Sequence, residues 1–368
     1  MKTILILTAG FGEGHNSAAR NLGEALVHLG GEKVRVEVLD LFETAYPHTN
    51  GFTRRLYISA INKTPRLWQW FYKLLDRPRL FESTLFTFAP LEKVLEKTLA
   101  EKKPAAVCCT YPAYNFLIER LARRGVRRDY LHLTVVTDSI SINSLWYRAP
   151  SEYFVVPNTE TFALMEKAGV PSEKMKVFGF PVQLDFALPE RRCIPLDPAA
   201  GRPKVLYIIN SGKAKAPELV RRLLAHEEID LSIAVGRDEK LTADIREICR
   251  GQEHRVELIG WTSRMPQLLM SHHLVITKAG GATTQEAIAA ECPPIFNQVV
   301  PGQEEGNWEL VRRADGGALA EQPAETAEWV KKALENNGAI WRQWRENLHR
   351  INRPESALTA ARFILEKI

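Results

Sequence analysis

The chain has 368 residues, of which 45% are hydrophobic and 25% are charged, and its formal net charge is +5. This composition is that of a globular protein, and the length suits two α/β domains better than one hydrophobic core. No run of about 18 uncharged apolar residues occurs, so we expect no membrane-spanning helix. The net charge is small, so attraction to an acidic partner would need a local cluster of Lys and Arg.

The five cysteines are scattered and lack the spacing of metal ligands. They are therefore expected to be free thiols in a reducing cytoplasm. The N-terminal stretch MKTILILTAGFGEGH has no cleavage site and runs directly into a Gly-rich turn, which is typical of a strand and not of a signal peptide. We therefore expect a cytoplasmic protein.

The first strand–turn–helix unit spans residues 2–29. The apolar run KTILILT is followed by a Gly-rich turn and by a helical pattern of apolar residues, which is typical of a doubly wound domain. A second strand ends in Asp40, the kind of residue that binds the ribose of NAD. However, the turn places His15 where a pyrophosphate needs small residues, so the spacing argues against a dinucleotide site.

His15 is the candidate general base. It lies in the predicted first turn of a helix, whose partial positive charge favours the neutral imidazole and leaves a nitrogen able to accept a proton near neutral pH. From the residues alone, a polar side chain that bonds its own loop is the more common role of such a histidine.

Residues 52–81 combine many aromatic side chains with seven Lys and Arg and one acidic residue. Trp and Tyr beside Lys and Arg are typical of a protein that lies at a bilayer interface with anionic headgroups. Binding of single-stranded nucleic acid and an ordinary core with a solvated basic face remain alternatives. The residues expected to contact the membrane and the acceptor are Arg54, Arg55, Arg66, Trp68, Trp70 and Lys73.

Two further apolar runs, at residues 105–110 and 130–137, predict buried strands. Asp138 follows the second run at its C-terminal end, where α/β sheets place their ligands. Its carboxylate could orient His15 or contact an acceptor, and a helix cap is the alternative. A strand–helix–strand pattern completes a first domain at residue 182, and a Pro-rich stretch without periodicity follows as a linker over residues 183–202.

The most informative stretch of the second half runs from residue 274 to residue 307. A buried strand leads to Gly280 and Gly281, which open a helix expected to begin near Thr283 or Thr284. Such a helix N-terminus binds anions. Glu286 lies one turn further on, within reach of the two hydroxyls of a ribose. On local grounds an ordinary strand–turn–helix unit remains the alternative.

The segment ITKAGGATTQEA, followed by PGQEEGN, resembles the donor-binding region of the glycosyltransferases that make monogalactosyl- and glucosyl-diacylglycerol, relatives of the MurG-type transferases. The resemblance implies a UDP-sugar site, with Glu286 on the ribose and the turn of Gln303 and Glu304 near the sugar. The matching residues are Lys278, Gly280, Gly281, Glu286, Gly302, Gln303, Glu304 and Asn307. The segment GEGHNSAA similarly resembles the family's GxGHxxAA motif, whose histidine, here His15, is taken as the base that activates the acceptor hydroxyl.

Other turns fit the same resemblance. The turn at Gly236 resembles the family's segment near the base, and the loop at Trp261 resembles one whose backbone reads the uracil edge. From the residues themselves, the backbone of Gly212 with Lys213 or Lys215 could lie against the diphosphate, although exposed lysines in a turn are more often merely solvated. The full implied donor set is Gly14, Gly212, Lys213, Gly236, Arg237, Trp261, Thr262, Met265, Lys278, Gly280, Gly281, Thr283, Glu286, Gln303, Glu304 and Asn307. Two positions depart from the family pattern: Asn143 stands where histidine is usual, and Gln183 stands where arginine is usual.

The resemblance implies a GT-B type fold, with two doubly wound Rossmann-like α/β domains facing a central cleft. The domains would span residues 1–182 and 203–349, and a C-terminal helix of about residues 350–368 would pack back on the first domain. Helical periodicity predicts helices over residues 324–336 and 340–368.

The resemblance also implies an inverting transfer of galactose or glucose, from UDP-galactose or UDP-glucose, to the hydroxyl of diacylglycerol. This transfer would take place at an anionic membrane surface. His15 and Asp138 would be the catalytic residues, and no metal or other cofactor is expected, because no Asp-x-Asp pair occurs. Nucleic acid is not an expected partner. The rival functions are transfer to another lipid acceptor such as a peptidoglycan precursor, a UDP-sugar epimerase, and a UDP-sugar-binding regulator without turnover.

Overall fold

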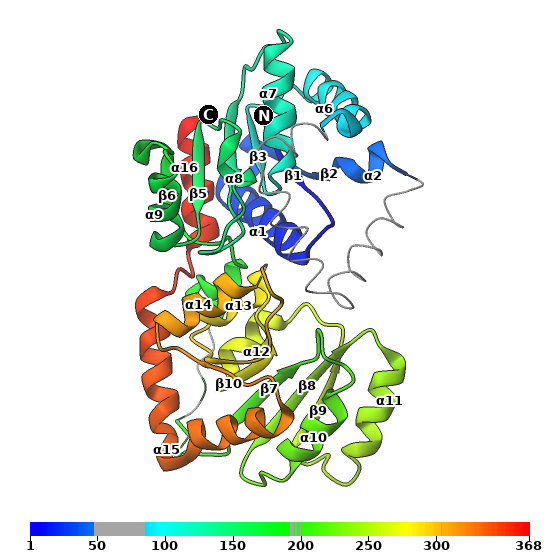
Figure 1. The fold of residues 1–368 in the computed structure, drawn as a ribbon, viewed down its shortest axis with the longest axis vertical. Helices are drawn as coiled ribbons and strands as arrows, with labels where there is room; N and C mark the ends of the chain where they lie inside the picture. Colours follow the sequence, from blue (N-terminus) through cyan, green and yellow to red (C-terminus); the bar gives the residue numbers. More distant parts are fainter. Residues whose placement is uncertain (48–84, 192–194, 196, 199, 303) are drawn as a thin grey trace. The chain divides into compact units, whose positions relative to one another are not determined.

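The computed structural model describes residues 1–47, 85–191, 195, 197, 198, 200–302 and 304–368 (Figure 1). The membrane prediction for Arg54, Arg55, Arg66, Trp68, Trp70 and Lys73 and the sugar prediction for Gln303 lie outside these described residues. The chain forms two compact units. Unit 1 comprises Met1–Leu184, Val300–Gly306 and Glu355–Ile368, and unit 2 comprises Asp185–Val299 and Asn307–Pro354.

Unit 1 is built on a six-stranded parallel sheet in the order β2-β1-β3-β4-β5-β6. The central strand β1 is fully buried from Ile4 to Leu7, as expected for a strand with helices on both faces of its sheet. The strands are β1 (Lys2–Thr8), β2 (Val34–Asp40), β3 (Ala106–Cys109), β4 (Leu131–Val135), β5 (Tyr153–Val156) and β6 (Met175–Val177). The helices are α1 (Glu13–Gly30), α2 (Leu41–Ala45), α6 (Ala89–Lys102), α7 (Ala113–Arg123), α8 (Leu145–Arg148), α9 (Thr159–Lys167) and α16 (Ser356–Lys367).

The C-terminal helix α16 packs against α1 within unit 1 (Figure 1). The start of α16 is fixed by Ser356, whose hydroxyl donates to the carbonyl oxygen of Phe180 and accepts from the backbone N–H of Val182. Near its end, Phe363 makes an edge contact with Tyr153 of β5, with 5.0 Å between ring centroids. Late residues of the chain therefore complete the core of unit 1.

Unit 2 is built on a second six-stranded parallel sheet, in the order β12-β11-β10-β7-β8-β9. Its order reverses between β7 and β10, which makes a crevice at the C-terminal ends of these two strands. The strands are β7 (Lys204–Ile208), β8 (Asp230–Gly236), β9 (Val256–Gly260), β10 (Leu274–Lys278), β11 (Pro294–Gln298) and β12 (Ala318–Leu319). The helices are α10 (Ala216–Leu224), α11 (Glu239–Ile248), α12 (Met265–Ser271), α13 (Gly281–Ala289), α14 (Glu305–Arg313, whose first two residues fall in unit 1) and α15 (Pro323–Ile351).

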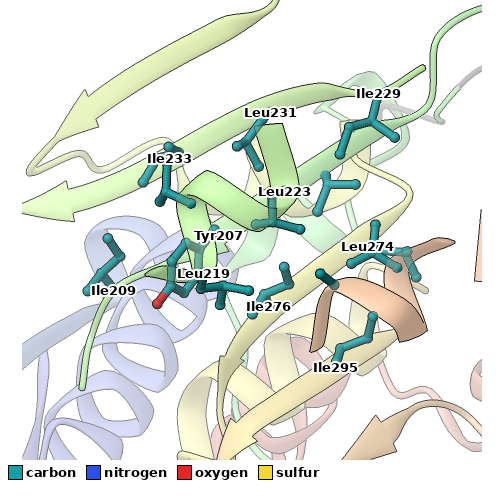
Figure 2. Close-up of a cluster of buried hydrophobic side chains, with 14 of the residues drawn as sticks. Tyr207, Ile209, Leu219, Leu223, Ile229, Leu231, Ile233, Leu274, Ile276 and Ile295 are labelled. Carbon is teal, nitrogen blue, oxygen red and sulfur yellow. The ribbon is translucent and has the colours of Figure 1, made fainter. Parts of the chain in front are cut away.

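The core of unit 2 lies between its sheet and the covering helices (Figure 2). Tyr207, Ile233 and Ile276 from three adjacent strands are at most 1% exposed, and they pack with Leu219 and Leu223 of α10. Aliphatic side chains on neighbouring parallel strands form this continuous layer because both faces of the sheet are covered. The two parallel sheets confirm the predicted doubly wound α/β architecture.

Two predicted helix boundaries are wrong. Helix α13 begins at Gly281 and not near Thr283, because Gly280 takes the N-cap position with an extended backbone. The predicted helix over residues 340–368 is two helices: α15 ends at Ile351 and α16 begins at Ser356, with Pro354, which lacks a backbone N–H, between them. The predicted break before residue 340 is confirmed by the non-helical backbone from Glu335 to Gly338. Across the described ranges, no helix has the length and apolar character to cross a bilayer.

Candidate active site

In unit 1, His15 lies where the chain leaves β1 and enters α1. Gly12 is the N-cap of α1 with an extended backbone, so His15 is the third residue of the helix, in the predicted first turn. The loop before it is fixed by Asp40 at the end of β2: one carboxylate oxygen accepts from the N–H of Gly10 (2.7 Å) and the other from the N–H of Phe42 (3.0 Å). Asp40 thus holds the loop that positions His15.

The imidazole of His15 contacts residues in the loops that follow β3 and β4. Its Nδ1 lies 2.8 Å from the hydroxyl oxygen of Thr137, which follows β4. Tyr111, which follows β3, makes an edge contact at 5.2 Å, and the indole of Trp146 lies 5.8 Å away. The Nε2 side of the ring lies toward Gly12, where an added Cβ would be 3.9 Å from Nε2.

The pKa of His15 is lowered from its ordinary value of 6.5. The largest cause is burial, which disfavours the charged imidazolium, while the negative charge of Asp138 and a hydrogen bond with the backbone of Thr110 act in the opposite direction. The imidazole is therefore mostly neutral at neutral pH. This is the protonation state that a general base requires.

Asp138 does not cap a helix. Its Oδ2 accepts a hydrogen bond from the indole Nε1–H of Trp146 (2.8 Å), and Trp146 itself is buried. The carboxylate is thus fixed near His15 and acts on it through charge. Asn143, at the position where the family has histidine, is buried and accepts from the backbone N–H of Leu145 (3.0 Å), so its amide serves the local turn.

In unit 2, the N-terminus of α13 follows the end of β10, at the edge of the sheet where β10 pairs with β7. No described side chain caps this nine-residue helix. Its first-turn N–H groups, with the partial positive charge of the helix end, therefore form an anion-binding surface. Glu286 follows in the second turn and is 7% exposed.

Polar groups from several elements border the same crevice. Asn210, after β7, donates from Nδ2 to the hydroxyl of Thr277 in β10 (3.0 Å). Asn307 donates to the carbonyl oxygen of Ala279 (2.9 Å) and so fixes the turn before α13. The buried oxygens that have no hydrogen-bond partner among the described residues include Ser211 Oγ, Thr284 Oγ1 and Gln298 Oε1. Buried polar atoms are normally paired, so these oxygens mark a place where a ligand can bind.

A pocket of about 640 Å³ opens beside the crevice, at the ends of β7 and β8. Lys213 and Asp238 form an ion pair across it (2.6 Å), and Arg237 places its guanidinium 4.8 Å from the ring centre of Trp261. Trp261 is 66% exposed, which is unusual for tryptophan and makes its ring available for stacking. The pocket is lined by Ile209, Asn210, Lys213, Val235, Gly236, Arg237, Asp238 and Glu239.

The structure thus gathers most of the predicted donor set at one edge of one sheet. These residues end or follow β7, β8, β9 and β10 and are Gly212, Lys213, Gly236, Arg237, Trp261, Thr262, Met265, Lys278, Gly280, Gly281, Thr283 and Glu286. Gly14 and Glu304 belong to unit 1. The carboxylate of Glu304 accepts from the backbone N–H of Val300 (3.0 Å) and so braces its own turn.

Sequence reasoning missed several residues of both sites, namely Thr110, Tyr111, Thr137, Asn210, Ser211 and Gln298. All six lie at the C-terminal edge of a sheet: Gln298 ends β11, and the other five follow β3, β4 or β7 within three residues. The rule that α/β sheets bind ligands at this edge would have found them once the strand ends were known. Among the described residues, no group of three or more His, Cys, Asp or Glu could hold a metal ion.

Residues 15–182 match the model of the monogalactosyldiacylglycerol (MGDG) synthase family. The match covers less than half of the chain and falls within unit 1. The matched range contains His15, Thr137, Asp138 and Trp146, so the site in unit 1 lies within it. The resemblance seen in the sequence motifs is thereby confirmed.

Relatives named as a diacylglycerol glucosyltransferase and as an MGDG synthase are similar to this chain over both units. A processive diacylglycerol beta-glucosyltransferase of Bacillus cytotoxicus is 26% identical over 373 residues, covering 99% of this chain and 93% of that protein. Monogalactosyldiacylglycerol synthase 1, chloroplastic, of Arabidopsis thaliana is 26% identical over 346 residues, covering 89% of this chain and 64% of that protein. The two identities are equal, so they do not separate a glucosyl from a galactosyl transferase.

Solved structures share the fold. The structure of Os79 from O. sativa in complex with UDP has a TM-score of 0.64 and 13% sequence identity, covering 99% of this chain and 100% of that chain. At this identity the likeness concerns the fold alone. Together with the two six-stranded parallel sheets, it confirms the predicted GT-B fold class.

Proposed function

We propose that the protein transfers a hexose from a UDP-hexose to the hydroxyl of diacylglycerol, with inversion at the anomeric carbon. The observation that carries this proposal is similarity along almost the whole chain to a protein named for diacylglycerol glucosyl transfer. Both sites described above fall within the similar range. The rival functions, including another lipid acceptor, an epimerase and a regulator without turnover, have no comparable support.

His15 would act as the general base in unit 1. With Nδ1 held by the Thr137 hydroxyl, Nε2 takes the proton of the acceptor hydroxyl as that oxygen attacks the anomeric carbon. The Asp138 carboxylate, fixed by Trp146, stabilises the imidazolium that forms. The C–O bond to UDP breaks as the new C–O bond forms, which inverts the anomeric centre.

The UDP-hexose would bind at the crevice of unit 2. The uracil would lie near Gly236 and the exposed ring of Trp261, and the ribose hydroxyls would bond the carboxylate of Glu286. The diphosphate would bind the N–H groups at the start of α13, which also stabilise the negative charge of the departing UDP. We propose that this helix end removes the need for a metal ion.

The deciding experiment is an incubation with radiolabelled UDP-glucose and UDP-galactose in parallel, with diacylglycerol in mixed micelles and EDTA present. We expect label from one donor in the organic phase, which identifies the reaction and the hexose together. Label that appears only with a peptidoglycan lipid precursor, or a new sugar released without any acceptor, would contradict the proposed acceptor. Activity lost in EDTA and restored by Mg²⁺ or Mn²⁺ would contradict the metal-free leaving-group site.

We also propose that the protein associates with anionic membrane surfaces. The support is the composition of residues 52–81, where cations and aromatic residues are interleaved and only one acidic residue occurs. Neutralising Arg54, Arg55, Arg66 and Lys73 should reduce co-sedimentation with vesicles that contain anionic lipid. A variant with four exposed cations of unit 2 neutralised (Arg221, Arg222, Lys331 and Lys332) is the matched control, and equal binding by both variants would refute the assignment.

A further inference from the structure

Gln298 occupies an irregular position at the end of β11. Thr277 of β10 pairs with Phe296, but the next residue, Lys278, pairs with Gln298, so Asn297 is an extra residue in β11. The backbone oxygen of Gln298 accepts from the N–H of Ala279 (2.9 Å), in the turn that leads into α13. The irregularity therefore brings Gln298 to the end of the sheet, beside the anion-binding helix N-terminus.

The amide of Gln298 meets the turn after β7. In the sheet, β10 lies between β11 and β7, and a Cβ added to Gly212, after β7, would lie 3.7 Å from Gln298 Oε1. The amide oxygen and this turn therefore meet beyond the C-terminal end of β10. Gly212 has a φ of +63°, a conformation that side chains rarely adopt, so the turn stays without a Cβ beside the oxygen.

Gln298 Oε1 is inaccessible to solvent and has no hydrogen-bond partner among the described residues. A buried amide oxygen without a partner destabilises a fold, and natural structures keep few of them. Ser211 and Thr284, whose buried hydroxyls also lack partners in the described part of the chain, can donate as well as accept. An amide oxygen can only accept, so its partner must carry an O–H or N–H.

The parts of a UDP-hexose differ in whether they can donate a hydrogen bond to Gln298 Oε1. The diphosphate carries essentially no O–H at neutral pH and cannot donate to Oε1. The uracil would bind near Gly236 and Trp261, at the ends of β8 and β9, which lie on the other side of β7 from Gln298. The ribose hydroxyls would be taken by Glu286. The hydroxyls of the transferred hexose are the donors that remain.

We infer that Gln298 is a specificity-determining residue whose Oε1 accepts a hydrogen bond from one hydroxyl of the donor hexose. This inference rests on the proposed UDP-hexose transfer and names the residue that would read the sugar. A site built to bond a hydroxyl discriminates strongly against a sugar that lacks it, because the buried oxygen is then left unpaired.

The test compares binding of UDP with binding of each UDP-hexose by calorimetry. Gln298→Met keeps the length of the side chain and removes the amide. We expect the Kd of UDP to stay within about twofold and the Kd of the preferred UDP-hexose to rise about tenfold, as one lost hydrogen bond to a sugar implies. A UDP-hexose that lacks the contacted hydroxyl should bind the wild type and Gln298→Met equally.

The controls keep the outcomes distinct. Gln343→Met, the same substitution at an exposed position of α15, should change neither Kd. If Gln298→Met fails to fold, Gln298→Asn, which withdraws the oxygen by one methylene, should show the same selective loss for the sugar. An equal loss for UDP and UDP-hexose, or no loss for either, would overturn the inference while leaving the proposed transfer intact. A wild-type protein that binds neither ligand would overturn the proposed function itself.

Discussion

His15 shows how burial sets the reactivity of one side chain. Removal of water lowers the pKa of its imidazole, and the nearby Asp138 carboxylate partly opposes this shift. The balance leaves the pKa below 6.5, so the side chain is ready to accept a proton at neutral pH. The hydroxyl of Thr137 at Nδ1 fixes the orientation of the ring while this happens.

We expect His15→Ala to lower the rate of transfer by about 10²–10⁴-fold, the usual contribution of a general base. The Kd of UDP should stay nearly unchanged, because the residues proposed to bind UDP lie in unit 2. Initial rates and calorimetry on the same preparation check both statements. His28→Ala, at the exposed end of α1, is the matched control. Transfer by His15→Ala at the wild-type rate would exclude His15 as the base.

The pH dependence of kcat/KM offers a second test of His15, together with its neighbour Asp138. The base works when neutral, so kcat/KM should fall with acid through the pKa of His15, below pH 6.5. Asp138→Asn removes a negative charge that raises this pKa, so the acid limb should move to lower pH. Because an asparagine oxygen can still accept from Trp146, the fold should persist. A shift of the limb to higher pH would contradict the electrostatic role of Asp138.

At the residue scale, the motifs predicted which side chains form the candidate site but not which groups hold them in place. The glycine-rich turn and the helical pattern were enough to single out His15 in the sequence. Its partner Thr137 lies 122 positions away and becomes a neighbour only because β4 lies two strands from β1 in the sheet. The order of strands is a property of the whole domain, and local patterns do not contain it.

At the scale of elements, the uncapped start of α13 is the main feature of unit 2. Its position was predicted from the strand and the two glycines, yet its first residue was misplaced by two, because Gly280 is the N-cap and Gly281 begins the helix. The first and last residues of a helix depend on the backbone conformation of single residues, and the sequence pattern predicts this conformation poorly. The polar atoms around α13 come from β7 and β11, so they also required the sheet order.

Thr283→Asp should separate the stability of α13 from its role in binding. A carboxylate in the first turn interacts favourably with the helix dipole, by about 0.3–1 kcal/mol, so the melting temperature should not fall. The same charge repels a diphosphate, so the Kd of UDP should rise about tenfold or more, and less at high salt. Thr283→Asn is the uncharged control. Unchanged UDP affinity in Thr283→Asp would place the diphosphate elsewhere.

At the scale of the whole molecule, each unit contains a buried histidine that resists protonation. Burial lowers the pKa of His132 in unit 1 to about 3 and of His272 in unit 2 to about 4. The unfolded chain protonates these groups near 6.5, so acid favours unfolding. Above pH 6.5 neither histidine lowers the free energy of unfolding. Below it, each histidine lowers this free energy by about 1.4 kcal/mol per pH unit until the pH reaches the pKa of that histidine in the folded state.

Urea unfolding at pH 7 and pH 5 should therefore give a lower free energy of unfolding at pH 5. His272→Gln, which removes one such histidine, should flatten the dependence on pH, whereas His28→Gln, at an exposed position, should not. A wild-type stability that is equal at the two pH values would refute this account.

The packing of α16 on α1 also has a consequence for protein synthesis. The strands of unit 1 emerge from the ribosome before those of unit 2, but the core of unit 1 is complete only after α16 has emerged. All of unit 2, from Asp185 to Pro354, is translated before that moment. We therefore expect unit 2 to finish folding before unit 1. Until α16 has been translated, the apolar face of α1 is uncovered and can be bound by chaperones.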